Sequence, residues 1–386
     1  MSEIDLTNDE KARYARHLIL PQVGESGQKM IKSSSVLVVG AGGLGSPVLM
    51  YLAAAGVGRI GIIDDDKVDM TNLQRQIIHS TSSVGELKTE SAKKRIHQIN
   101  PEIVVELFDS RLTIENAEEI ISKFDIIVDG TDNFATRYTI SDCCEILGKP
   151  WVFGSIHRFE GQVSVFNLNG SPNYRDLFPK APPPELAPNC AEAGVLGVLP
   201  GIVGSFQANE VLKIILKMDG ILDYELLLID TQTMNIRKLR YSMNKDREKV
   251  TELSEEAISC ALSLDEEESL DASHNSENMK EISPLEYVEK LKNGWKPFFL
   301  DVRRESEEKI VSLPNTSLRI DHTDIPSRID EIPKDREIVI YCRSGARSAM
   351  VANFLKLSGN YPMDVYNLSG GIHLWSSTID SSVPRY

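Results

Sequence analysis

A short apolar run that leads directly into a glycine-rich loop limits the possible folds more than any other part of this sequence. Residues 35–39 read SVLVV, residues 40–45 read GAGGLG, and an Ala- and Leu-rich stretch follows from Ser46 to Ala55. A short β-branched run is typical of a buried strand, and the stretch after the loop is typical of a helix. The order strand, glycine loop, helix predicts a sheet whose faces are covered by helices.

Two more apolar runs, at residues 59–63 and 124–128, extend this pattern. Because apolar strands alternate with helical stretches, we predict an α/β fold, namely a Rossmann-like domain with a mostly parallel sheet. A second α/β pattern comprises a helix at 284–292, strands at 297–302 and 337–341, and a helix from Ser344. This second pattern predicts a further, small α/β domain.

The 386 residues suit two or three domains of about 150 residues each. Residues 251–280 are rich in Asp, Glu, Ser and Asn and poor in apolar side chains. Such a segment buries too little apolar surface to offset the entropy of ordering, so we expect an acidic linker, with some helix possible at 251–264. The predicted domains are therefore residues 1–250 and 281–386.

The composition favours a globular enzyme of the cytoplasm. A net charge of −15 argues against general nucleic-acid binding. The sequence has no long apolar run, and its first residues lack the basic head and apolar stretch of a secretory signal. Five cysteines do not make a disulfide framework, which favours a reducing compartment.

The glycine loop is a candidate nucleotide site. Its glycines are Gly40, Gly42, Gly43 and Gly45. Glycines allow the backbone to approach phosphate oxygens, and the N-terminus of the following helix supplies N–H donors. The next apolar run ends at Asp64, Asp65 and Asp66, about 20 residues further on, where a carboxylate is placed to accept hydrogen bonds from ribose hydroxyls. This pattern alone also suits a dinucleotide, so a nicotinamide-dependent oxidoreductase is one alternative.

Charged residues outside the loop are candidate partners for a triphosphate. A Walker loop carries a lysine after its last glycine, whereas Ser46 and Pro47 follow here. If a triphosphate binds, its cationic partners come from elsewhere, and residues 72–76 (NLQRQ) and 84–88 (VGELK) supply candidates. Residues 129–133 (DGTDN) follow the third apolar run and can place a carboxylate near a magnesium ion.

Together these motifs closely resemble those of the adenylyltransferases that activate sulfur-carrier proteins. This family belongs to the ubiquitin-activating-enzyme superfamily and includes molybdopterin- and thiamine-pathway members. The resemblance covers roughly residues 5–240 and includes RYAR at 13–16, GVLG at 194–197 and LPGIVG at 199–204. It implies that the chain uses ATP and Mg²⁺ to adenylate the C-terminal Gly-Gly carboxylate of a small ubiquitin-like carrier protein, with pyrophosphate as the leaving group.

The resemblance also implies roles for individual residues. Arg75 and Lys88 neutralise the phosphates, and Asn72 helps to orient them. Asp64 holds the ribose, and Asp132 binds the magnesium ion that accompanies ATP.

Two further residues are linked to partner proteins. Arg16 reaches the site of a second subunit, because members of the family act as homodimers. Cys190 follows a proline-rich segment, residues 178–188, that is typical of an extended and accessible loop. Its thiol is either inert or bonds to the activated carrier as a thioester or acyl disulfide. The thioester gives an alternative function, in which the chain activates a ubiquitin-like modifier for conjugation to proteins.

The sequence departs from these relatives at a structural zinc site. Most relatives hold zinc with two CxxC pairs, and the positions of the first pair are Asn173 and Asp176 here. Residues 239–250, where the second pair belongs, contain no cysteine. Because zinc needs four ligands, commonly thiolates, we predict that no structural zinc is bound.

The second α/β region contains a candidate nucleophile. Residues 342–348 read CRSGARS, directly after an apolar run and before a helical stretch. Backbone N–H groups at a helix N-terminus and nearby arginines stabilise a thiolate. Four residues separate Cys342 from Arg347, one fewer than in phosphatases with a similar loop, and the tighter ring suits a single sulfur atom.

With LDVR at 300–303 and NLSGGIHLW at 367–375, this loop resembles that of a rhodanese domain over residues 282–380. One departure is SLPN at 312–315, where relatives often read GHIPG. The resemblance implies that Cys342 carries a persulfide, whose sulfur converts the acyl adenylate into a thiocarboxylate. The implied partners are the carrier and a sulfur donor, such as a cysteine desulfurase or thiosulfate. Whether the carrier serves molybdopterin, thiamine, cysteine or tRNA thiolation stays open.

Overall fold

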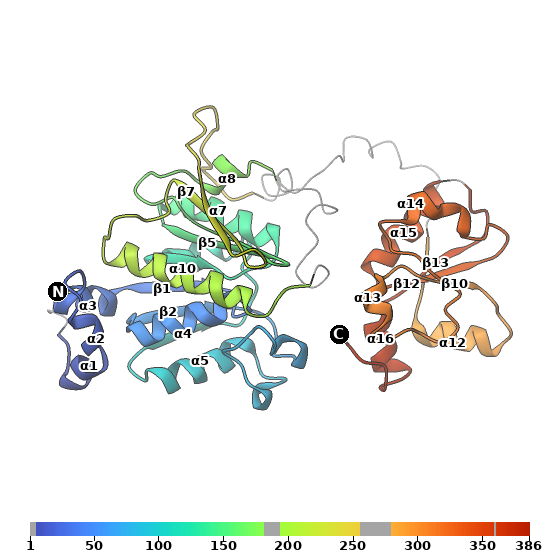
Figure 1. The fold of residues 1–386 in the computed structure, drawn as a ribbon, viewed down its shortest axis with the longest axis horizontal. Helices are drawn as coiled ribbons and strands as arrows, with labels where there is room; N and C mark the ends of the chain where they lie inside the picture. The colour runs from blue at the N-terminus through green and yellow to red at the C-terminus, as the bar shows by residue number, and fades with distance from the viewer. Residues whose placement is uncertain (1–4, 181–193, 255–278, 359) are drawn as a thin grey trace. The chain divides into compact units, whose positions relative to one another are not determined.

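The structure is a computed structural model that describes residues 5–180, 194–254, 279–358 and 360–386. The chain divides into two compact units, Met1–Asp265 and Glu266–Tyr386, and Figure 1 shows the elements of each. The predicted domain boundaries, at 250 and 281, stay predictions, because residues 255–278 lie outside the described part. Among the described residues, no helix combines the length and the apolarity that crossing a membrane needs.

The first unit contains one sheet with helices around it. Its strands are β1 (Ser35–Val39), β2 (Arg59–Ile63), β3 (Val104–Phe108), β4 (Ile126–Asp129), β5 (Trp151–His157), β6 (Glu160–Phe166), β7 (Glu225–Asp230) and β8 (Asn235–Arg240). Its helices are α1 (Asn8–Arg13), α2 (Ala15–Leu18), α3 (Gly24–Ser33), α4 (Gly45–Ala55), η1 (Met70–Asn72), η2 (Thr81–Ser83), α5 (Lys88–Ile99), α6 (Ala117–Ser122), α7 (Phe134–Leu147), α8 (Tyr174–Leu177) and α10 (Leu199–Ile215).

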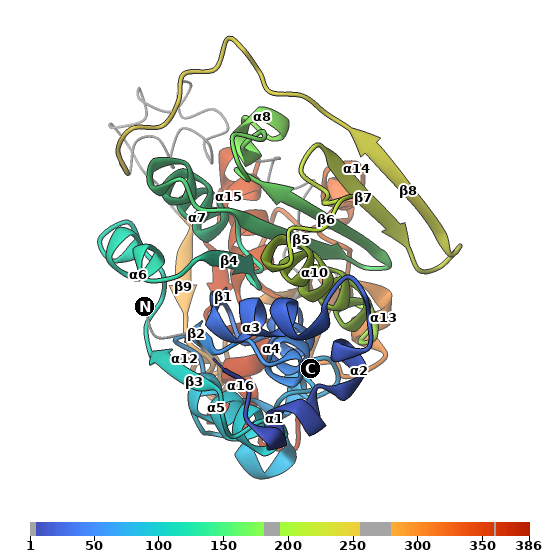
Figure 2. The same cartoon turned by 90° about the vertical axis from the view of Figure 1, so that its left-hand side faces the viewer.

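The strands follow the order β3-β2-β1-β4-β5-β6-β7-β8. Neighbours from β3 to β5 pair in parallel, and neighbours from β5 to β8 pair antiparallel. Figure 2 shows β8 at the outer edge of this sheet. The predicted Rossmann-like, mostly parallel sheet is confirmed, whereas the antiparallel half was not predicted.

Side chains that alternate along β1 belong to two cores, one on each face of the sheet. Val36 and Val38 pack in the core that includes apolar residues of α4, α5 and α10. Leu37 and Val39 pack in the core that includes residues of α6 and α7. A strand with both faces covered must be apolar at every position, which explains the SVLVV run.

One strand begins later than predicted. The apolar run starts at Phe124, but β4 begins at Ile126. The Phe124 ring lies against Gly61, where an added Cβ would come within 2.3 Å of it, and the Asp125 N–H donates to the carbonyl of Ser35. Phe124 is therefore apolar because it fills the space above a glycine of β2 and not because it belongs to the strand.

The second unit is a smaller α/β structure with a parallel sheet in the order β11-β10-β12-β13-β9. Its strands are β9 (Lys280–Ile282), β10 (Phe298–Asp301), β11 (Leu318–Arg319), β12 (Ile338–Tyr341) and β13 (Val365–Leu368). Its helices are α12 (Pro284–Lys292), α13 (Glu305–Glu308), α14 (Ile325–Arg328), η3 (Ile329–Glu331), α15 (Ala346–Leu357) and α16 (Gly371–Thr378).

Both faces of the second sheet are also covered. Leu300 and Ile340 pack with residues of α14 and α15, while Phe299 and Val339 pack with residues of α12 and α16. The helix predicted from Ser344 begins at Ala346, because Gly345 has a φ of +98° and so stands outside the helix.

Candidate functional site

The glycine loop joins β1 to α4 and lies against the turn that follows β4. Gly40 has a φ of +95°, and a Cβ there would lie 2.8 Å from the carbonyl oxygen of Gly130. A Cβ on Gly45 would lie 2.0 Å from the carbonyl oxygen of Gly40. These two positions admit no side chain, because the chain turns sharply and the ends of two neighbouring strands approach each other.

Asp64 braces the glycine loop from the end of β2. One carboxylate oxygen accepts from the N–H of Ala41 (2.8 Å), and the other accepts from the N–H of Asp66 (2.9 Å). Burial raises the pKa of Asp64, although Lys88 and these two N–H groups act in the opposite direction. The structure thus places the predicted ribose-binding carboxylate directly beside the loop.

Lys88 and Arg75 lie on the two segments that follow β2. Lys88 is the buried first residue of α5, and its Nζ is 2.7 Å from an Asp66 carboxylate oxygen. Arg75 is half-buried, and its guanidinium donates to the Thr71 carbonyl at 3.2 Å. A Cβ on Gly43 would lie 3.7 Å from Cγ of Arg75, so this side chain starts next to the loop.

Asn72 ends η1 and has a local role in this structure. Its Oδ1 accepts from the N–H of Asp69, while the Asp69 carboxylate accepts from the N–H of Thr71. The reciprocal bonds hold the short helix that precedes Arg75. They fix the backbone from which the Arg75 side chain extends.

Two carboxylates after β4 have different surroundings. Asp129 is fully buried, and its oxygens accept from Arg137 (3.0 Å) and from the N–H of Thr131 (2.8 Å). Asp132 is exposed at the start of the following segment. Asp129 therefore holds the turn together, and Asp132 is the carboxylate of this segment that a solvated ion can reach.

Two buried residues beside the glycine loop, His79 and Gln76, were not among the predicted site residues. His79 contacts the Ala41 carbonyl oxygen through Nε2 (2.9 Å) and Ser91 Oγ through Nδ1 (2.9 Å), and burial lowers its pKa. The amide of Gln76 lies near Gly42, whose added Cβ would be 3.6 Å from Nε2, and its buried Oε1 has no hydrogen-bond partner among the described residues. Gln76 ends the NLQRQ segment, in which only Asn72 and Arg75 were given roles, and no local pattern distinguishes His79 from other polar residues of a loop.

Two predicted site residues, Arg16 and Cys190, are not among the residues that the structure shows around the glycine loop. Arg16 is exposed on α2, and its predicted role depends on a second subunit, which a single chain does not test. Cys190 lies outside the described residues, so its role stays a prediction.

The positions that the resemblance assigned to zinc ligands carry polar contacts in this chain. Asn173 caps α8 and accepts from Ser141 Oγ (2.8 Å). Asp176 accepts from Nε of Arg247 (2.8 Å), and the same guanidinium donates to both Glu145 oxygens at 3.0 and 2.7 Å. Burial lowers the pKa of Arg247, but its bonds to Glu145 and Asp176 outweigh burial and raise it. Arg247 thus ties the segment after β8 to α7 and α8.

In the second unit, Cys342 lies at the carboxyl end of β12 and begins the loop that leads into α15. Its Sγ accepts from the N–H of Gly345 at 3.1 Å and lies 3.4 Å from Ser348 Oγ. Its exposed fraction is 0%, so a reagent reaches the sulfur only when residues of the loop move aside. The structure confirms the predicted placement before a helix and shows a thiol that is closed off from solvent.

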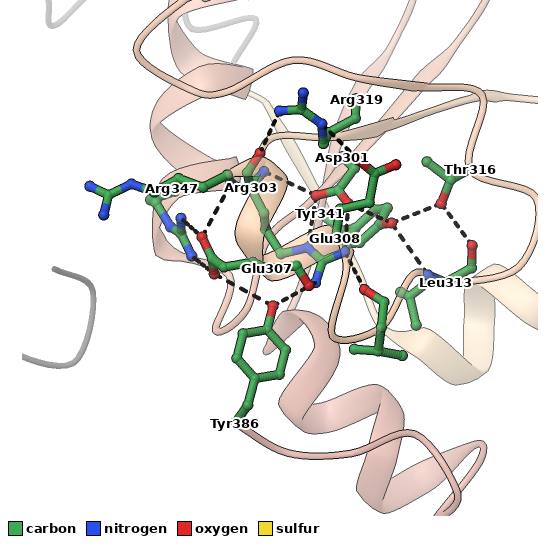
Figure 3. Close-up of polar contacts among 12 residues, drawn as sticks. Asp301, Arg303, Glu307, Glu308, Leu313, Thr316, Arg319, Tyr341, Arg347 and Tyr386 are labelled. Atoms are coloured by element: carbon green, nitrogen blue, oxygen red, sulfur yellow. Dashed lines mark hydrogen bonds and ion pairs between the residues drawn. The ribbon is translucent and has the colours of Figure 1, made fainter. Parts of the chain in front are cut away.

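The charged side chains near this loop form a connected set of ion pairs, drawn in Figure 3. Arg303, fully buried, donates to both oxygens of Asp301 at 2.9 and 2.6 Å. Arg347, at the start of α15, donates to both oxygens of Glu307 at 2.7 Å each. Arg347 and the LDVR motif were recognised in the sequence, whereas Glu307, which comes from α13, was not.

Residues 312–315, which depart from the motif common in rhodanese domains, lie next to a contact with Tyr341 of β12. Asn315 has a φ of +66°, a conformation that Asn adopts more readily than most residues. Thr316 Oγ1 is 2.7 Å from the Leu313 carbonyl oxygen and 2.8 Å from the Tyr341 hydroxyl, as Figure 3 shows. The tyrosine hydroxyl donates in turn to Asp301 (3.0 Å).

The fold and the two loops show that the chain combines two kinds of unit. One is a Rossmann-type unit with a glycine loop that Asp64 braces, and the other presents a cysteine at a helix N-terminus. The comparisons with known proteins agree with this division. The ThiF family matches residues 14–250, and the rhodanese-like domain matches residues 284–378. The chain belongs to the ThiF family and carries a rhodanese-like domain.

Three relatives indicate how far the similarity extends. The probable adenylyltransferase/sulfurtransferase MoeZ of Mycobacterium tuberculosis is 42% identical, and the alignment covers 99% of this chain and 96% of the relative. The adenylyltransferase and sulfurtransferase MOCS3 of Anopheles gambiae is 38% identical, over 99% and 90% of the two chains. The sulfur carrier protein adenylyltransferase of Thermus thermophilus is 52% identical, over 62% of this chain and 90% of the relative.

Solved structures share the fold of the first unit. Escherichia coli MccB has a TM-score of 0.56 at 20% identity, over 65% of this chain and 74% of that chain. The structure of MccB with ATP has a TM-score of 0.54 at 21% identity, over 64% and 75%. At this identity, the likeness shows the fold alone.

Proposed function

We propose that the chain adenylates the C-terminal Gly-Gly carboxylate of a small ubiquitin-like sulfur-carrier protein and then transfers sulfur to it, which gives a thiocarboxylate. One observation carries the proposal: Asp64, Lys88 and Arg75 converge near the glycine loop of a chain that also presents Cys342 at a helix N-terminus. The relatives named adenylyltransferase and sulfurtransferase, which cover nearly the whole chain, support both activities.

In the first reaction, a carboxylate oxygen of the carrier attacks the α-phosphorus of ATP, and pyrophosphate leaves. The reaction needs positioning and charge stabilisation more than covalent chemistry. The glycine loop and the N-terminus of α4 face the phosphates, while Arg75 and Lys88 neutralise them. Lys88 exchanges its contact with Asp66 for a phosphate oxygen. The ATP complex of MccB, which shares the fold, supports ATP as the nucleotide.

Magnesium is the ion that accompanies ATP in this proposal, and Asp132 is its protein ligand. Mg²⁺ prefers oxygen ligands and keeps several waters, so one exposed carboxylate beside the phosphates suits it. Asp132 is exposed, whereas Asp129 is committed to Arg137 and Thr131. When bound, the ion supplies charge neutralisation on the phosphate oxygens.

In the second reaction, the Cys342 thiolate attacks the outer sulfur of a donor such as thiosulfate, and sulfite leaves. The terminal sulfur of the resulting persulfide then attacks the acyl carbon of the adenylate, and AMP leaves. A thiol then attacks the Cys342 sulfur of the acyl disulfide. This step releases the thiocarboxylate of the carrier and leaves a disulfide between Cys342 and the attacking thiol. A cysteine desulfurase is the other candidate donor.

We further propose that the chain binds no structural zinc and that it acts as a homodimer. Arg247, with Glu145 and Asp176, links the end of the first unit to α7 and α8, where relatives use zinc. Two copies of the chain form a homodimer, in which Arg16 of one copy reaches the nucleotide of the other. Elemental analysis of the purified protein tests the first statement, and sedimentation tests the second.

The adenylation step is tested by carrier-dependent exchange of labelled pyrophosphate into ATP. The full chain, with a carrier that ends in Gly-Gly, is expected to catalyse the exchange, and a carrier without its last glycine is expected to give none. Tight NADH binding without any exchange would instead support the oxidoreductase alternative.

A further inference from the structure

Tyr386, the last residue of the printed sequence, lies in the ion-pair set beside the Cys342 loop and has no part in the proposed chemistry. Its hydroxyl oxygen accepts from Nη1 of Arg303 at 2.5 Å and is 3.5 Å from Oε1 of Glu307 (Figure 3). Burial raises the pKa of Tyr386 to about 12, so the phenol keeps its proton and can donate to Glu307 while it accepts from Arg303.

Glu307 links Tyr386 to the helix that follows the Cys342 loop. Its two oxygens accept from Arg347, the second residue of α15, in a bidentate pair. Burial raises the pKa of Glu307, but the hydrogen bonds and charge of Arg347 outweigh burial and lower it. The carboxylate is therefore ionised at neutral pH and holds the first turn of α15, whose N-terminus faces the cysteine.

The backbone of Tyr386 reaches the other side of the loop. Its carbonyl oxygen lies 3.2 Å from Nε2 of His373 on α16. The first turn of α16 donates to the loop itself, from the N–H of Ile372 to the Cys342 carbonyl and from the N–H of His373 to the Arg343 carbonyl, both at 3.1 Å. Tyr386 thus contacts α16 directly, through His373, and contacts α15 indirectly, through Glu307, which pairs with Arg347.

We propose that Tyr386 is a positioning residue for sulfur transfer, which fixes the loop around Cys342 through Glu307 and Arg347. The proposal rests on the proposed role of Cys342 as the persulfide carrier. Since Cys342 is fully buried and its Sγ accepts from the N–H of Gly345, small shifts of the loop change the donors that face the sulfur.

The test uses the full chain with thiosulfate as donor and cyanide as acceptor. Tyr386→Phe removes the hydroxyl and keeps the ring, and we expect kcat to fall about tenfold, with a much smaller change in the KM of thiosulfate. Tyr361→Phe is the matched control, because this buried hydroxyl donates to the Ile329 carbonyl (3.0 Å) and should leave kcat unchanged.

A double-mutant cycle separates positioning from general stability. If Tyr386 acts through Glu307, then Glu307→Gln and Tyr386→Phe together cost no more in kcat than Glu307→Gln alone. Additive losses, or a kcat for Tyr386→Phe equal to that of the control, would overturn the inference. The rate at which iodoacetamide alkylates Cys342 at fixed pH gives a second readout, which should change in Tyr386→Phe but not in Tyr361→Phe.

Failure of the proposed function has a different signature. If Cys342→Ser transfers sulfur as fast as the parent chain, Cys342 is not the persulfide carrier, whatever Tyr386→Phe does. If Cys342→Ser is inactive and Tyr386→Phe is unchanged, the proposed function stands and only the role of Tyr386 is lost.

Discussion

The glycine loop of the first unit and the Cys342 loop of the second occupy equivalent places, since each follows a parallel strand and leads into a helix. They differ in how the nearby charges are held. Beside the glycine loop, Lys88 makes a single ion-pair contact with the exposed Asp66, Arg75 donates to a backbone carbonyl, and Asp132 is exposed. Beside the Cys342 loop, Arg303 and Arg347 each form a bidentate pair with a carboxylate.

The difference agrees with what we propose that each loop holds. A triphosphate brings several negative charges, so its site needs cations that can turn toward the ligand. A persulfide is bonded to the protein and adds one small anion, so its site needs a fixed loop whose N–H groups point at the sulfur. Mutations at the first loop should therefore affect binding and charge neutralisation, and mutations at the second should affect geometry.

The largest expected effect is that of Cys342→Ser. A serine hydroxyl cannot carry a persulfide, so transfer from thiosulfate to cyanide should fall at least about a thousandfold. Carrier-dependent pyrophosphate exchange should remain, because it belongs to the other unit. Loss of both activities would show that the two loops are not chemically independent.

Lys88→Ala and Arg75→Ala should have the next largest effect. Each removes one cation that we propose neutralises the phosphates, and we expect pyrophosphate exchange to fall about a hundredfold. Lys94→Ala is the matched control on α5, because this exposed lysine pairs with Glu86. Exchange at the parental rate in Lys88→Ala would place the phosphates elsewhere, and sulfur transfer to cyanide should stay unchanged in all three variants.

Arg247→Met tests how the end of the first unit is held. The substitution leaves Glu145 and Asp176 buried without a counterion, and we expect the free energy of unfolding to fall by roughly 3 kcal/mol. Arg240→Met, at an exposed pair with Glu225, should change it little. A metal chelator should leave the unfolding midpoint of the parent chain unchanged, and a clear loss of stability would indicate a structural metal.

The smallest effect concerns the pH dependence of Glu307. Its folded pKa lies below the ordinary glutamate value of about 4.3, so its contribution to stability is complete above that value and is lost as the pH falls through the lowered one. The difference in urea unfolding between the parent chain and Glu307→Gln should thus be present at neutral pH and disappear in acid. A difference that grows in acid would contradict this sign.

The elements that the sequence predicted well are those encoded by a local pattern. Two such patterns are the SVLVV strand with its glycine loop and the strand that leads into the Cys342 loop. Each spans about ten residues, so it can be recognised without knowledge of tertiary contacts. The family resemblance then pointed to Asp64, Lys88 and Arg75, which the structure brings near one loop.

The elements and contacts that were missed join residues far apart in the sequence. Arg247 meets Glu145 across 102 residues, and Tyr386 meets Arg303 across 83. The ring of Phe124 shows the opposite error, in which an apolar residue was assigned to a strand although it packs on Gly61. Tertiary packing decides these cases, and no window along the sequence contains both partners.

The most direct test of the coupled reactions is the mass of the carrier after incubation with the full chain, ATP, magnesium and thiosulfate, followed by reduction. We predict a gain equal to the replacement of one oxygen by one sulfur, present with the parent chain and absent with Cys342→Ser or without ATP. A carrier of unchanged mass, in a mixture where pyrophosphate exchange and sulfur transfer to cyanide both proceed, would mean that the two activities do not act on one substrate.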